Sequence, residues 1–479
     1  MHRFFSIKSL VVLIVLITAG CGLVGKRSDE KAVPLPDSVW VETGEEAGRL
    51  LSEYIRIKSI NPPGNEAEAA KFLADVLEKE GIAYKIFESA PGRANLVARL
   101  KGDGSEKPIL LLNHMDVVPA EAEGWSVEPF SGEIKDGFVW GRGTIDMKGQ
   151  GIVELLAFID AKRRNLSLKR DIIFLALADE EQGGRFGAQW MVENHFDEVN
   201  AEYVLNEGGF GFVGLAPQLP PVYLVSYAEK GVLWLKLRAK GTAGHGSIPR
   251  KDNANLKLAR ALEKIGEWQQ DFRVPKAVGA FTSAISEGKS VPKKMLYRMV
   301  SGAFYLPPVK SLLASKEELY PEFHNTVSIT VLKGGYKENV IPSESEAVLD
   351  CRLLPGTSHE KFIEELRDII QDPDIDIEII EWSEPSESPV DTEMFKVILQ
   401  ILKKIEPSSV SVPFLFTAGT DSATFRKVGI TSYGVAPFIM QPDDAPRAHG
   451  IDERISIANL GRGVQFYKEI IERMCVKGH

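Results

Sequence analysis

Apolar side chains recur along the chain with two distinct spacings. Residues 45–58 and 66–80 carry them every three to four positions, as one face of a helix requires, and the second range ends at Gly81, a common helix stop. Short apolar runs typical of buried strands follow at residues 109–112, 172–178 and 203–205. They alternate with further helical patterns at residues 149–163 and 188–195. This alternation predicts an α/β fold in which a sheet has helices on both faces.

The pattern changes at about Gly231. Two strand-like stretches, V-L-W-L-K-L-R-A-K and T-V-S-I-T-V-L-K, lie on either side of a helical pattern at 253–268, which predicts a smaller α+β domain inserted within the first. Residues 270–325 have weak periodicity and are expected to be an irregular or helical elaboration of that insert. Helices and short strands resume at about Pro389 and end with a helix at 457–474. We expect a signal peptide at 1–21, a tether at 22–40, a catalytic domain at 41–230 and 386–479, and the insert at 231–385.

The first residues have the composition of an export signal. His2, Arg3 and Lys8 precede the apolar run 10–17, which is well short of the roughly 20 apolar residues that a spanning helix needs. The following T-A-G-C resembles a bacterial lipobox, in which cleavage exposes a cysteine for lipid attachment. We therefore expect an exported lipoprotein, anchored in the membrane through Cys21 and facing the periplasm or the cell exterior. A plainly secreted protein and an uncleaved signal anchor are the alternatives.

Composition narrows the function further. A chain of 479 residues, 44% of them hydrophobic, can bury a large core and form two or three domains. The net charge of -10 and pI near 5.5 argue against a nucleic-acid partner, which needs a clustered basic surface. Beyond Cys21, only Cys351 and Cys475 remain, too few for a disulfide framework. Cys351 lies in the strand-like run A-V-L-D-C-R-L-L, where it is expected to be a small buried hydrophobe.

Five short stretches carry imidazole or carboxylate side chains of the kind that bind divalent cations. They are L-N-H-M-D-V-V-P, G-R-G-T-I-D-M-K-G, A-D-E-E-Q-G-G, N-E-G-G and R-A-H-G-I-D-E-R. Each of them is expected to follow a strand, and ligands in α/β sheets collect beyond the carboxyl ends of strands. Histidine and carboxylate ligands suit zinc and similar ions, and a cluster that keeps an open coordination position is a hydrolytic catalyst.

Taken singly, each of these residues also has a purely structural explanation. His114 and Asp116 are two positions apart at a strand end and share a face, but a histidine there is more often structural. Asp146 precedes a helix and could be its cap. Glu180 and Glu181 continue a run of three acids at the end of a buried strand, which is costly unless cations or solvent compensate, so a solvated acidic loop is the alternative.

Together the stretches resemble the di-zinc metallopeptidase family that includes aminoacylase, acetylornithine deacetylase, succinyl-diaminopimelate desuccinylase, glutamate carboxypeptidase and carboxypeptidase S. The resemblance covers about residues 45–474, and the T-A-G-T-D and H-G-I-D-E-R stretches look closest to the carboxypeptidase S branch. It implies a zinc-peptidase-like catalytic domain with a mixed sheet. It also implies that Asp146 bridges two ions, with His114 and Glu207 completing one site and Glu181 and His449 the other.

The same resemblance implies that Asp116 orients His114 and that Glu180 is the general base. The chemistry supports this independently, because two cations acidify a shared water and a carboxylate held off the metals can take its proton. Glu180 is the candidate because its neighbour Glu181 is used for coordination.

The insert resembles the family's lid, which in relatives often also forms the dimer contact. In T-A-G-H-G-S, His245 matches an imidazole that stabilises the oxyanion, often across a dimer; an ordinary turn histidine is the alternative. Asn339 and Arg352 match positions that hold the substrate's carbonyl and free carboxylate, although Arg352 could equally form a surface ion pair. Gly419, Thr420 and Asp421, in T-A-G-T-D-S, resemble the loop that closes the substrate end.

We therefore expect a metal-dependent hydrolase that cleaves a peptide or N-acyl amide bond next to a free carboxylate. The expected cofactors are two zinc ions, with cobalt or manganese as alternatives. Carboxypeptidase or dipeptidase action on small peptides and aminoacylase action on N-acyl amino acids both remain open, and a homodimer is expected from the resemblance. A non-catalytic ligand-binding lipoprotein is the alternative from another class, but it would have no use for Glu180 beside a full ligand set. A structural or adhesion lipoprotein would leave the ligand pattern unexplained.

Overall fold

The computed structural model describes residues 37–214, 220–276, 302, 304–315, 320–441 and 443–478. The predicted signal peptide with Cys21, and residues 22–36 of the predicted tether, lie outside these ranges. Helix α2 (Asp37–Ile55) begins inside the predicted tether, because Trp40 is buried against the core as part of the apolar face of this helix. Within the described ranges, the structure contains no helix whose length and apolar content would let it cross a bilayer.

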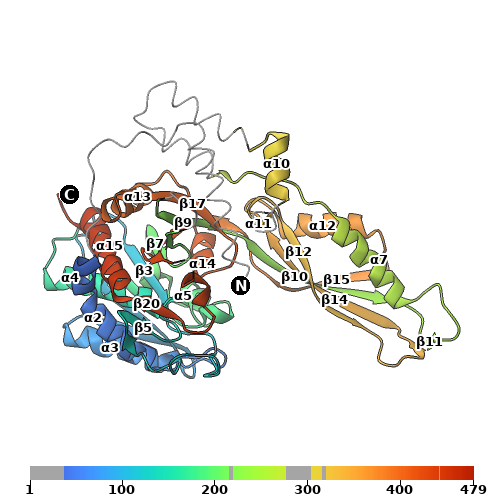
Figure 1. Cartoon of the computed structure of the whole chain (residues 1–479), viewed down its shortest axis with the longest axis horizontal. Helices are drawn as coiled ribbons and strands as arrows, with labels where there is room; N and C mark the ends of the chain where they lie inside the picture. The colour runs from blue at the N-terminus through green and yellow to red at the C-terminus, as the bar shows by residue number, and fades with distance from the viewer. Residues whose placement is uncertain are drawn as a thin grey trace.

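A large mixed sheet forms the body of the molecule (Figure 1). Its order is β1 (Tyr84–Ala90), β2 (Arg93–Leu100), β6 (Ile172–Leu177), β3 (Ile109–His114), β7 (Tyr203–Asn206), β18 (Thr431–Gly434), β9 (Val222–Glu229), β8 (Gly211–Phe212) and β19 (Ile439–Met440), with β16 (Ser386–Glu387) and β17 (Val410–Phe416) also paired to β9. The central strands β6, β3, β7 and β18 run parallel, and β3, β6 and β7 are buried along their whole length. This explains why they appear in the sequence as continuous apolar runs.

Successive residues of β3 point to opposite faces of the sheet and join two different cores. Ile109 and Leu111 pack in the larger core, whereas Leu110 and Leu112 pack in the smaller one. The larger core is covered by α2, α3 (Glu66–Lys79), α4 (Lys148–Arg163), α13 (Glu393–Ile405) and α15 (Ile457–Cys475), and the smaller by α5 (Ala188–Asn194) and α14 (Ser422–Lys427). Short helix α6 (Phe196–Val199) follows α5. The sheet therefore has helices on both faces, as the sequence predicts.

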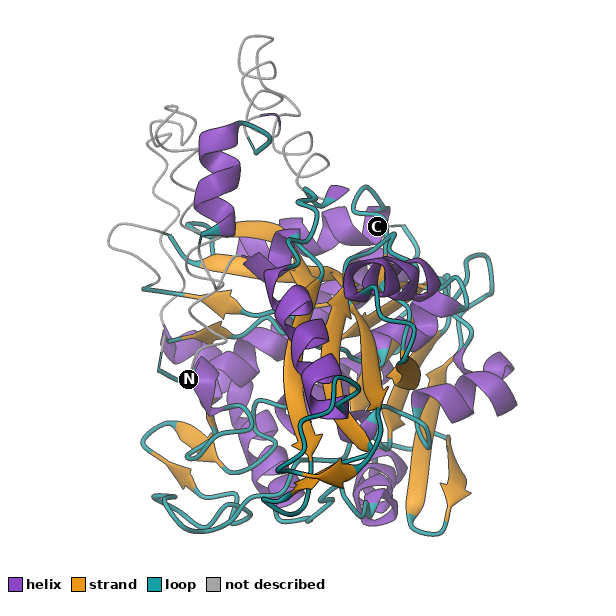
Figure 2. Cartoon of the chain, turned by 90° about the vertical axis from the view of Figure 1, so that its right-hand side faces the viewer, coloured by secondary structure: helices purple, strands orange, loops and turns teal. Residues whose placement is uncertain are grey.

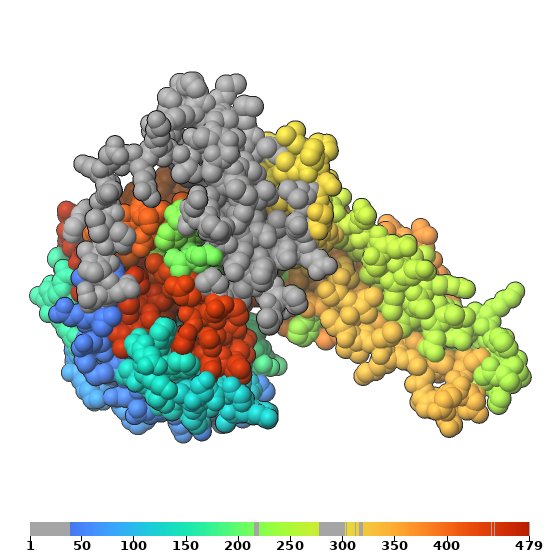
Figure 3. Space-filling view, viewed as in Figure 1, coloured from blue at the N-terminus to red at the C-terminus, as the bar shows by residue number. Residues whose placement is uncertain are grey.

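A second sheet forms an arm that projects from this body. Its strand order is β12 (Thr326–Gly334), β14 (Glu344–Leu353), β10 (Gly231–Lys240) and β15 (Ile375–Trp382), all antiparallel. Burial alternates along β10 and β14, and their inward residues form a separate core with helices α7 (Ala254–Glu267) and α12 (His359–Ile370). Figure 2 views the arm end-on, with helices lying over the strands, and Figure 3 shows body and arm diverging. Cys351 is buried on β14, and neither it nor Cys475 is in a disulfide.

Two small sheets complete the described structure. Strands β11 (Gly244–His245) and β13 (Val340–Ile341) pair at the far end of the arm (Figure 1). In the body, β20 (Arg454–Ser456) pairs with β5 (Phe138–Trp140), which pairs with β4 (Ile134–Lys135). Within the stretch 270–325, predicted as irregular or helical, the described residues include helices α10 (Pro307–Ala314) and α11 (Tyr320–Phe323). Residues 277–301 lie outside the described ranges.

Candidate metal centre

Three neighbouring parallel strands end at the same place and present acidic or imidazole side chains there. His114 is the last residue of β3, Glu180 and Glu181 lie in the 3-10 turn η1 (Glu180–Gln182) after β6, and Glu207 follows β7. Because the strands are parallel and adjacent in the order β6-β3-β7, their carboxyl ends meet at one edge of the sheet.

Two loops bring the remaining candidates to this edge. Asp146 lies between β5 and α4, and His449 lies shortly before β20. The pairing of β20 with β5, with Arg454 opposite Trp140, aligns these two loops although they are far apart in the chain. His449 has a φ of 59°, a left-handed conformation uncommon outside glycine.

Asp146 lies between the two histidines. Its Oδ1 is 3.0 Å from Nε2 of His114, and its Oδ2 is 3.2 Å from Nε2 of His449. Glu207 Oε1 lies 3.4 Å from the same nitrogen of His114, and Glu181 Oε2 lies 3.1 Å from that of His449. Two triads that share Asp146 result, and in each triad the three ligand atoms lie within 4.8 Å of one another.

The hydrogen bonds of His114 test whether these groups fit a cation. Its Nδ1 is 2.9 Å from the carbonyl oxygen of Asp116, which can only accept, so Nδ1 carries the hydrogen of the neutral ring. In this tautomer Nε2 carries no hydrogen, and its lone pair faces the carboxylates of Asp146 and Glu207, whose negative charge repels it. A proton or a cation must lie between them. A neutral imidazole held by its other nitrogen and facing carboxylates is the arrangement of a metal ligand.

The crowding of carboxylates in the site shifts their pKa values. Burial, together with the nearby carboxylate of Asp146, raises the pKa of Glu207 to about 7. Burial and the charge of Glu207 raise the pKa of Glu180 well above its usual value. Although burial opposes it, the surrounding carboxylates raise the pKa of His114 well above 6.5. This cluster holds surplus negative charge that two divalent ions would neutralise.

Asp116 has two separate tasks in the structure. Its carbonyl oxygen is the closest acceptor for His114, and its carboxylate Oδ1 lies farther away, at 3.5 Å. The carboxylate accepts the backbone N–H groups of Glu180 and Glu181, at 3.2 and 3.1 Å. Asp116 therefore positions the acidic turn as well as the imidazole.

The sequence did not reveal how the acidic turn is supported. Asp179, the first of the three consecutive acids, has a φ of 73° and accepts hydrogen bonds from Arg93 at 2.7 Å and Asn61 at 3.0 Å. Arg93 also forms two bonds with the buried carboxylate of Glu66. Asp179 is thus neutralised by an arginine, and only the next two acids face the cluster. The run of three acids was the signal that some such partner must exist.

Comparison with known proteins identifies the family of the chain. The model of Peptidase family M20/M25/M40 matches residues 110–473. The chain belongs to this family. It is 31% identical to the probable carboxypeptidase S-like 2 of Dictyostelium discoideum, over 79% of this chain and 74% of that protein. It is 28% identical to the N-fatty-acyl-amino acid synthase/hydrolase PM20D1 of Mus musculus, over 96% and 94% of the two chains.

Solved structures share the fold. The M20 family metallo-carboxypeptidase Sso-CP2 from Sulfolobus solfataricus matches with a TM-score of 0.66 and 20% identity, over 89% of this chain and 98% of the other. Human carnosine dipeptidase 1 matches with a TM-score of 0.59 and 17% identity, over 92% and 99% of the chains. This M20 peptidase homologue is a metal-dependent hydrolase of the metallopeptidase and amidohydrolase class, as predicted, and the non-catalytic alternative is not favoured.

Within one chain, two of the substrate residues expected in the arm of this M20 protein, His245 and Asn339, lie at its end, apart from the metal centre. His245 lies on β11 at the end of the arm, exposed, with Nδ1 2.7 Å from Ser247 Oγ (Figure 1). Asn339 is beside it, since its carbonyl oxygen accepts the N–H of Gly246 at 2.8 Å. Arg352, on β14, forms a two-pronged ion pair with Asp350 at 2.8 and 3.1 Å, as the alternative of a surface ion pair predicts.

The loop containing Gly419 and Thr420 lies beside the metal centre. The N–H and hydroxyl of Thr420 donate to Glu229 at 2.9 and 2.8 Å, and Asn206, which precedes Glu207, donates to the Thr420 hydroxyl at 3.3 Å. In the described part of the chain, no atom beyond its immediate neighbours lies within 4 Å of where a side chain on Gly419 would begin, so the loop borders open space there.

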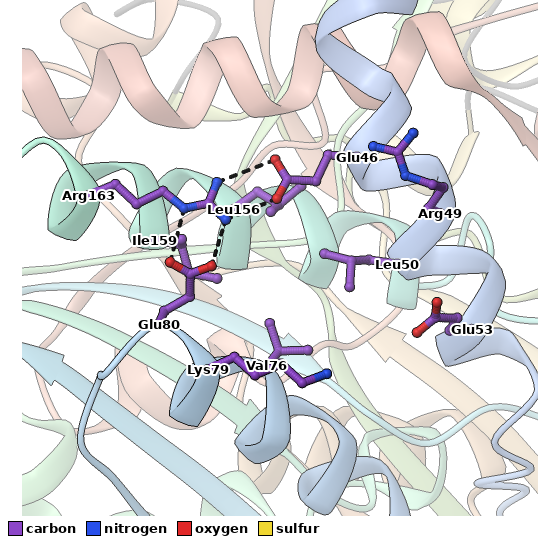
Figure 4. A pocket seen from close by; sticks show the side chains of 10 residues that line it. All are labelled: Glu46, Arg49, Leu50, Glu53, Val76, Lys79, Glu80, Leu156, Ile159 and Arg163. Carbon is purple, nitrogen blue, oxygen red and sulfur yellow. Dashed lines mark hydrogen bonds and ion pairs between the residues drawn. The ribbon is translucent and has the colours of Figure 1, made fainter.

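A well-formed hollow elsewhere on the body carries no comparable chemistry. It measures about 310 Å³ and lies among α2, α3 and α4 (Figure 4). Arg163, one of the residues that line the hollow, forms ion pairs with Glu46 and Glu80, which also line it. None of the candidate metal ligands lines this hollow, and its central charges are already paired, so the strand-end cluster remains the candidate site.

Proposed function

We propose that this chain is a dinuclear zinc hydrolase that cleaves N-acyl amino acids, releasing the acyl acid and the free amino acid. The observation that carries the proposal is that the two oxygens of Asp146 face two different histidines, at 3.0 and 3.2 Å. A carboxylate in that position can bridge two cations. Cobalt or manganese could occupy the same ligands, because nitrogen and oxygen donors accept all three metals.

Each metal would have three protein ligands. His114, Glu207 and Asp146 would hold one ion, and His449, Glu181 and Asp146 the other. Three ligands leave a coordination position open, as in other catalytic zinc sites. When bound, the two ions supply Lewis acidity, which activates water and polarises the scissile carbonyl.

Glu180 is assigned the proton transfers. It belongs to neither triad, yet its Oε2 lies 4.0 Å from Nε2 of His114, at the edge of the cluster. Oε2 takes a proton from the attacking water as the carbon–oxygen bond forms and returns it to the leaving nitrogen as the carbon–nitrogen bond breaks. The products are a carboxylic acid and an amine. Asp116 holds the backbone N–H groups of the turn that carries Glu180, and so limits its motion.

Substrate contacts are assigned to Arg352, Asn339, Gly419 and Thr420. An arginine fork suits a free carboxylate, so Arg352 would exchange Asp350 for the carboxylate of the substrate. His245 is assigned the oxyanion. Because it lies at the end of the arm, we propose that a second copy of the chain supplies it, in a homodimer.

The relatives support N-acyl amino acids as the substrate class. PM20D1 of Mus musculus is named an N-fatty-acyl-amino acid synthase/hydrolase, and Aminoacylase-1B of Rattus norvegicus is also similar, at 27% identity over 88% of this chain. The second candidate is removal of a C-terminal amino acid from small peptides, supported by the carboxypeptidase S-like relative.

One experiment separates these activities. Purified protein, loaded with zinc, is offered matched N-acyl amino acids of short and long acyl chain and dipeptides with the same C-terminal residue. We expect kcat/KM to be highest for an N-acyl substrate and activity to vanish after chelation and return with zinc. Turnover of dipeptides alone would replace the first substrate class with the second. No turnover by protein that holds two metal equivalents would overturn the proposal.

We also propose that the protein is an exported bacterial lipoprotein, with Cys21 as the lipid-bearing residue and the catalytic body outside the cytoplasm. The support is the apolar run followed by T-A-G-C in the sequence. Radiolabelled palmitate is expected to enter the wild-type protein and not Cys21→Ser. Equal labelling of both would contradict the assignment.

A further inference from the structure

The loops that carry Asp146 and His449 are fastened to one buried carboxylate, that of Glu453. Glu453 is 0% exposed and lies four residues after His449, directly before β20. It belongs to the stretch R-A-H-G-I-D-E-R, yet neither metal triad includes it. Its contacts explain what it does.

Each oxygen of Glu453 accepts two hydrogen bonds from the loop before α4. Oε1 accepts the N–H of Ile145 at 2.7 Å and that of Asp146 itself at 3.2 Å. Oε2 accepts the N–H of Gly143 at 3.0 Å and Nη1 of Arg142 at 2.7 Å. All four acceptor positions of the carboxylate are thus used on the segment that presents Asp146 to the cations.

Arg142 extends the connection to the histidine. Its Nη2 donates to the carbonyl oxygen of Gly450 at 2.9 Å, the residue after His449. A main-chain bond from Gly141 to the carbonyl oxygen of Glu453, 2.8 Å long, joins the same two segments. Arg142 and Glu453 therefore form a buried ion pair that locks the two loops in one relative position.

We infer that Glu453 is the positioning residue for the second cation, the one held by Asp146, Glu181 and His449. This inference deepens and rests on the proposed dinuclear function. Two of the three ligands of that cation lie on the loops that Glu453 joins, whereas only Asp146 among the ligands of the first cation does. Loss of the carboxylate is therefore expected to weaken the second site more than the first.

The test is Glu453→Gln, which keeps the size of the side chain. The NH₂ group of the new amide can only donate hydrogen bonds. In either orientation of the amide, this NH₂ group replaces an oxygen that accepts two N–H groups, so it faces two donors. Competition with a graded chelator measures the affinities of both metal equivalents, and the d–d absorption of cobalt-loaded protein reports each site. We expect the affinity of one equivalent to fall roughly tenfold to a hundredfold, the usual effect of groups that orient metal ligands, and the other to change less.

Asp171→Asn is the matched control. Asp171 also accepts a backbone N–H, from Gly102 at 2.9 Å, and pairs with Arg99 at 3.0 Å, but it precedes β6, at the end of the strand opposite the metal centre. We expect this variant to keep both metal affinities whatever its stability. Should Glu453→Gln fail to fold, Arg142→Lys is expected to weaken the same equivalent, because one ammonium nitrogen replaces the two guanidinium nitrogens that bind Glu453 and Gly450.

The results discriminate clearly. Selective loss of one equivalent in Glu453→Gln, with both retained in Asp171→Asn, supports the inference. Unchanged affinities, or an equal fall in both, would overturn it while leaving the dinuclear site intact. A wild-type protein that binds fewer than two equivalents would instead overturn the proposed function on which the inference rests.

Discussion

At the scale of single residues, the site is organised by which groups can donate and which can only accept. The carbonyl oxygen of Asp116 accepts a hydrogen bond from Nδ1 of His114, and Nε2 of the same ring faces the carboxylates of Asp146 and Glu207. These contacts at His114 set acceptor against acceptor, and a cation between them would relieve the repulsion. Glu180 lies at the edge of the cluster but belongs to neither triad, and we therefore assign it the proton transfer.

The first prediction at this scale concerns Glu180. Glu180→Gln is expected to lower kcat roughly 10² to 10⁴-fold, the usual contribution of a general base, because an amide cannot accept the proton of the water. Metal content, measured on the same sample, should stay at the wild-type level, since Glu180 lies outside both triads. Full activity with both metals bound would move the proton transfer to another group.

The second concerns protons released when metal binds. Hydrogen bonds to Asp146 and Glu181 raise the pKa of His449 to about 10 in the metal-free protein, so at neutral pH its ring carries a proton that a cation must displace. Metal affinity should therefore fall as the pH is lowered below about 10, by roughly tenfold per unit for each proton displaced. Calorimetry in two buffers with different heats of ionisation counts these protons. A count of zero at pH 7.5 would show that His449 is neutral before binding.

At the scale of elements, the body depends on a close approach of its first and last helices. An ideal Cβ on Gly44 of α2 would lie 2.0 Å from the carbonyl oxygen of Ile457, and one on Gly461 of α15 would lie 1.9 Å from that of Trp40. Only glycine allows the two backbones to come so near. Because α15 directly follows β20, this contact also anchors the strand next to the loop of His449.

We therefore predict that Gly461→Ala lowers the free energy of unfolding by about 1–3 kcal/mol, the usual effect of overpacking. Gly266→Ala is the control, because this residue lies in helix α7 and, among the described residues, no atom outside its own helical turns lies within 4 Å of the added carbon. It should raise the free energy of unfolding by about 0.5–1 kcal/mol, as alanine does in an open helical position. Urea denaturation of both variants measures the difference. Equal effects of the two substitutions would mean that the helices separate without cost.

At the scale of the whole molecule, the arm divides the proposed substrate contacts into two groups. Gly419 and Thr420 are beside the metal centre, and His245 and Asn339 are at the other end of the arm (Figure 1). A complete site therefore needs either a large movement of the arm or a second chain. The proposed homodimer supplies the second chain.

Complementation tests this arrangement. His245→Ala and Glu180→Gln should each lose most activity alone. When equal amounts are unfolded together and refolded, half of the dimers should be mixed, each with one complete site, which restores about a quarter of wild-type activity. Refolding each variant by itself is the control. No gain on mixing, despite mixed dimers, would place His245 in the site of its own chain.

Much of the fold follows from local patterns. The continuous apolar runs became the buried strands β3, β6 and β7, and the alternating patterns became β10 and β12. Parallel neighbours finish together, so the strand-end positions of residues 114, 180, 181 and 207 favoured a shared site, but the family resemblance was needed to assign the ligands. The start of the first helix was predicted too late, at residue 45, because its opening turns contain few apolar residues besides Trp40 to mark the buried face.

The sequence by itself thus determined the kind of chemistry, since ligand type and strand position are local properties. Only the tertiary structure decided which groups are partners. The pairing of β20 with β5 lets Glu453 accept a hydrogen bond from the backbone of Asp146. Arg93 forms an ion pair with Asp179, and Arg352 forms one with Asp350. Most of these contacts join segments far apart in the chain, and all depend on how strands register and side chains turn. Periodicity along the sequence carries no information about either, because it records only which residues are buried and not what they meet there.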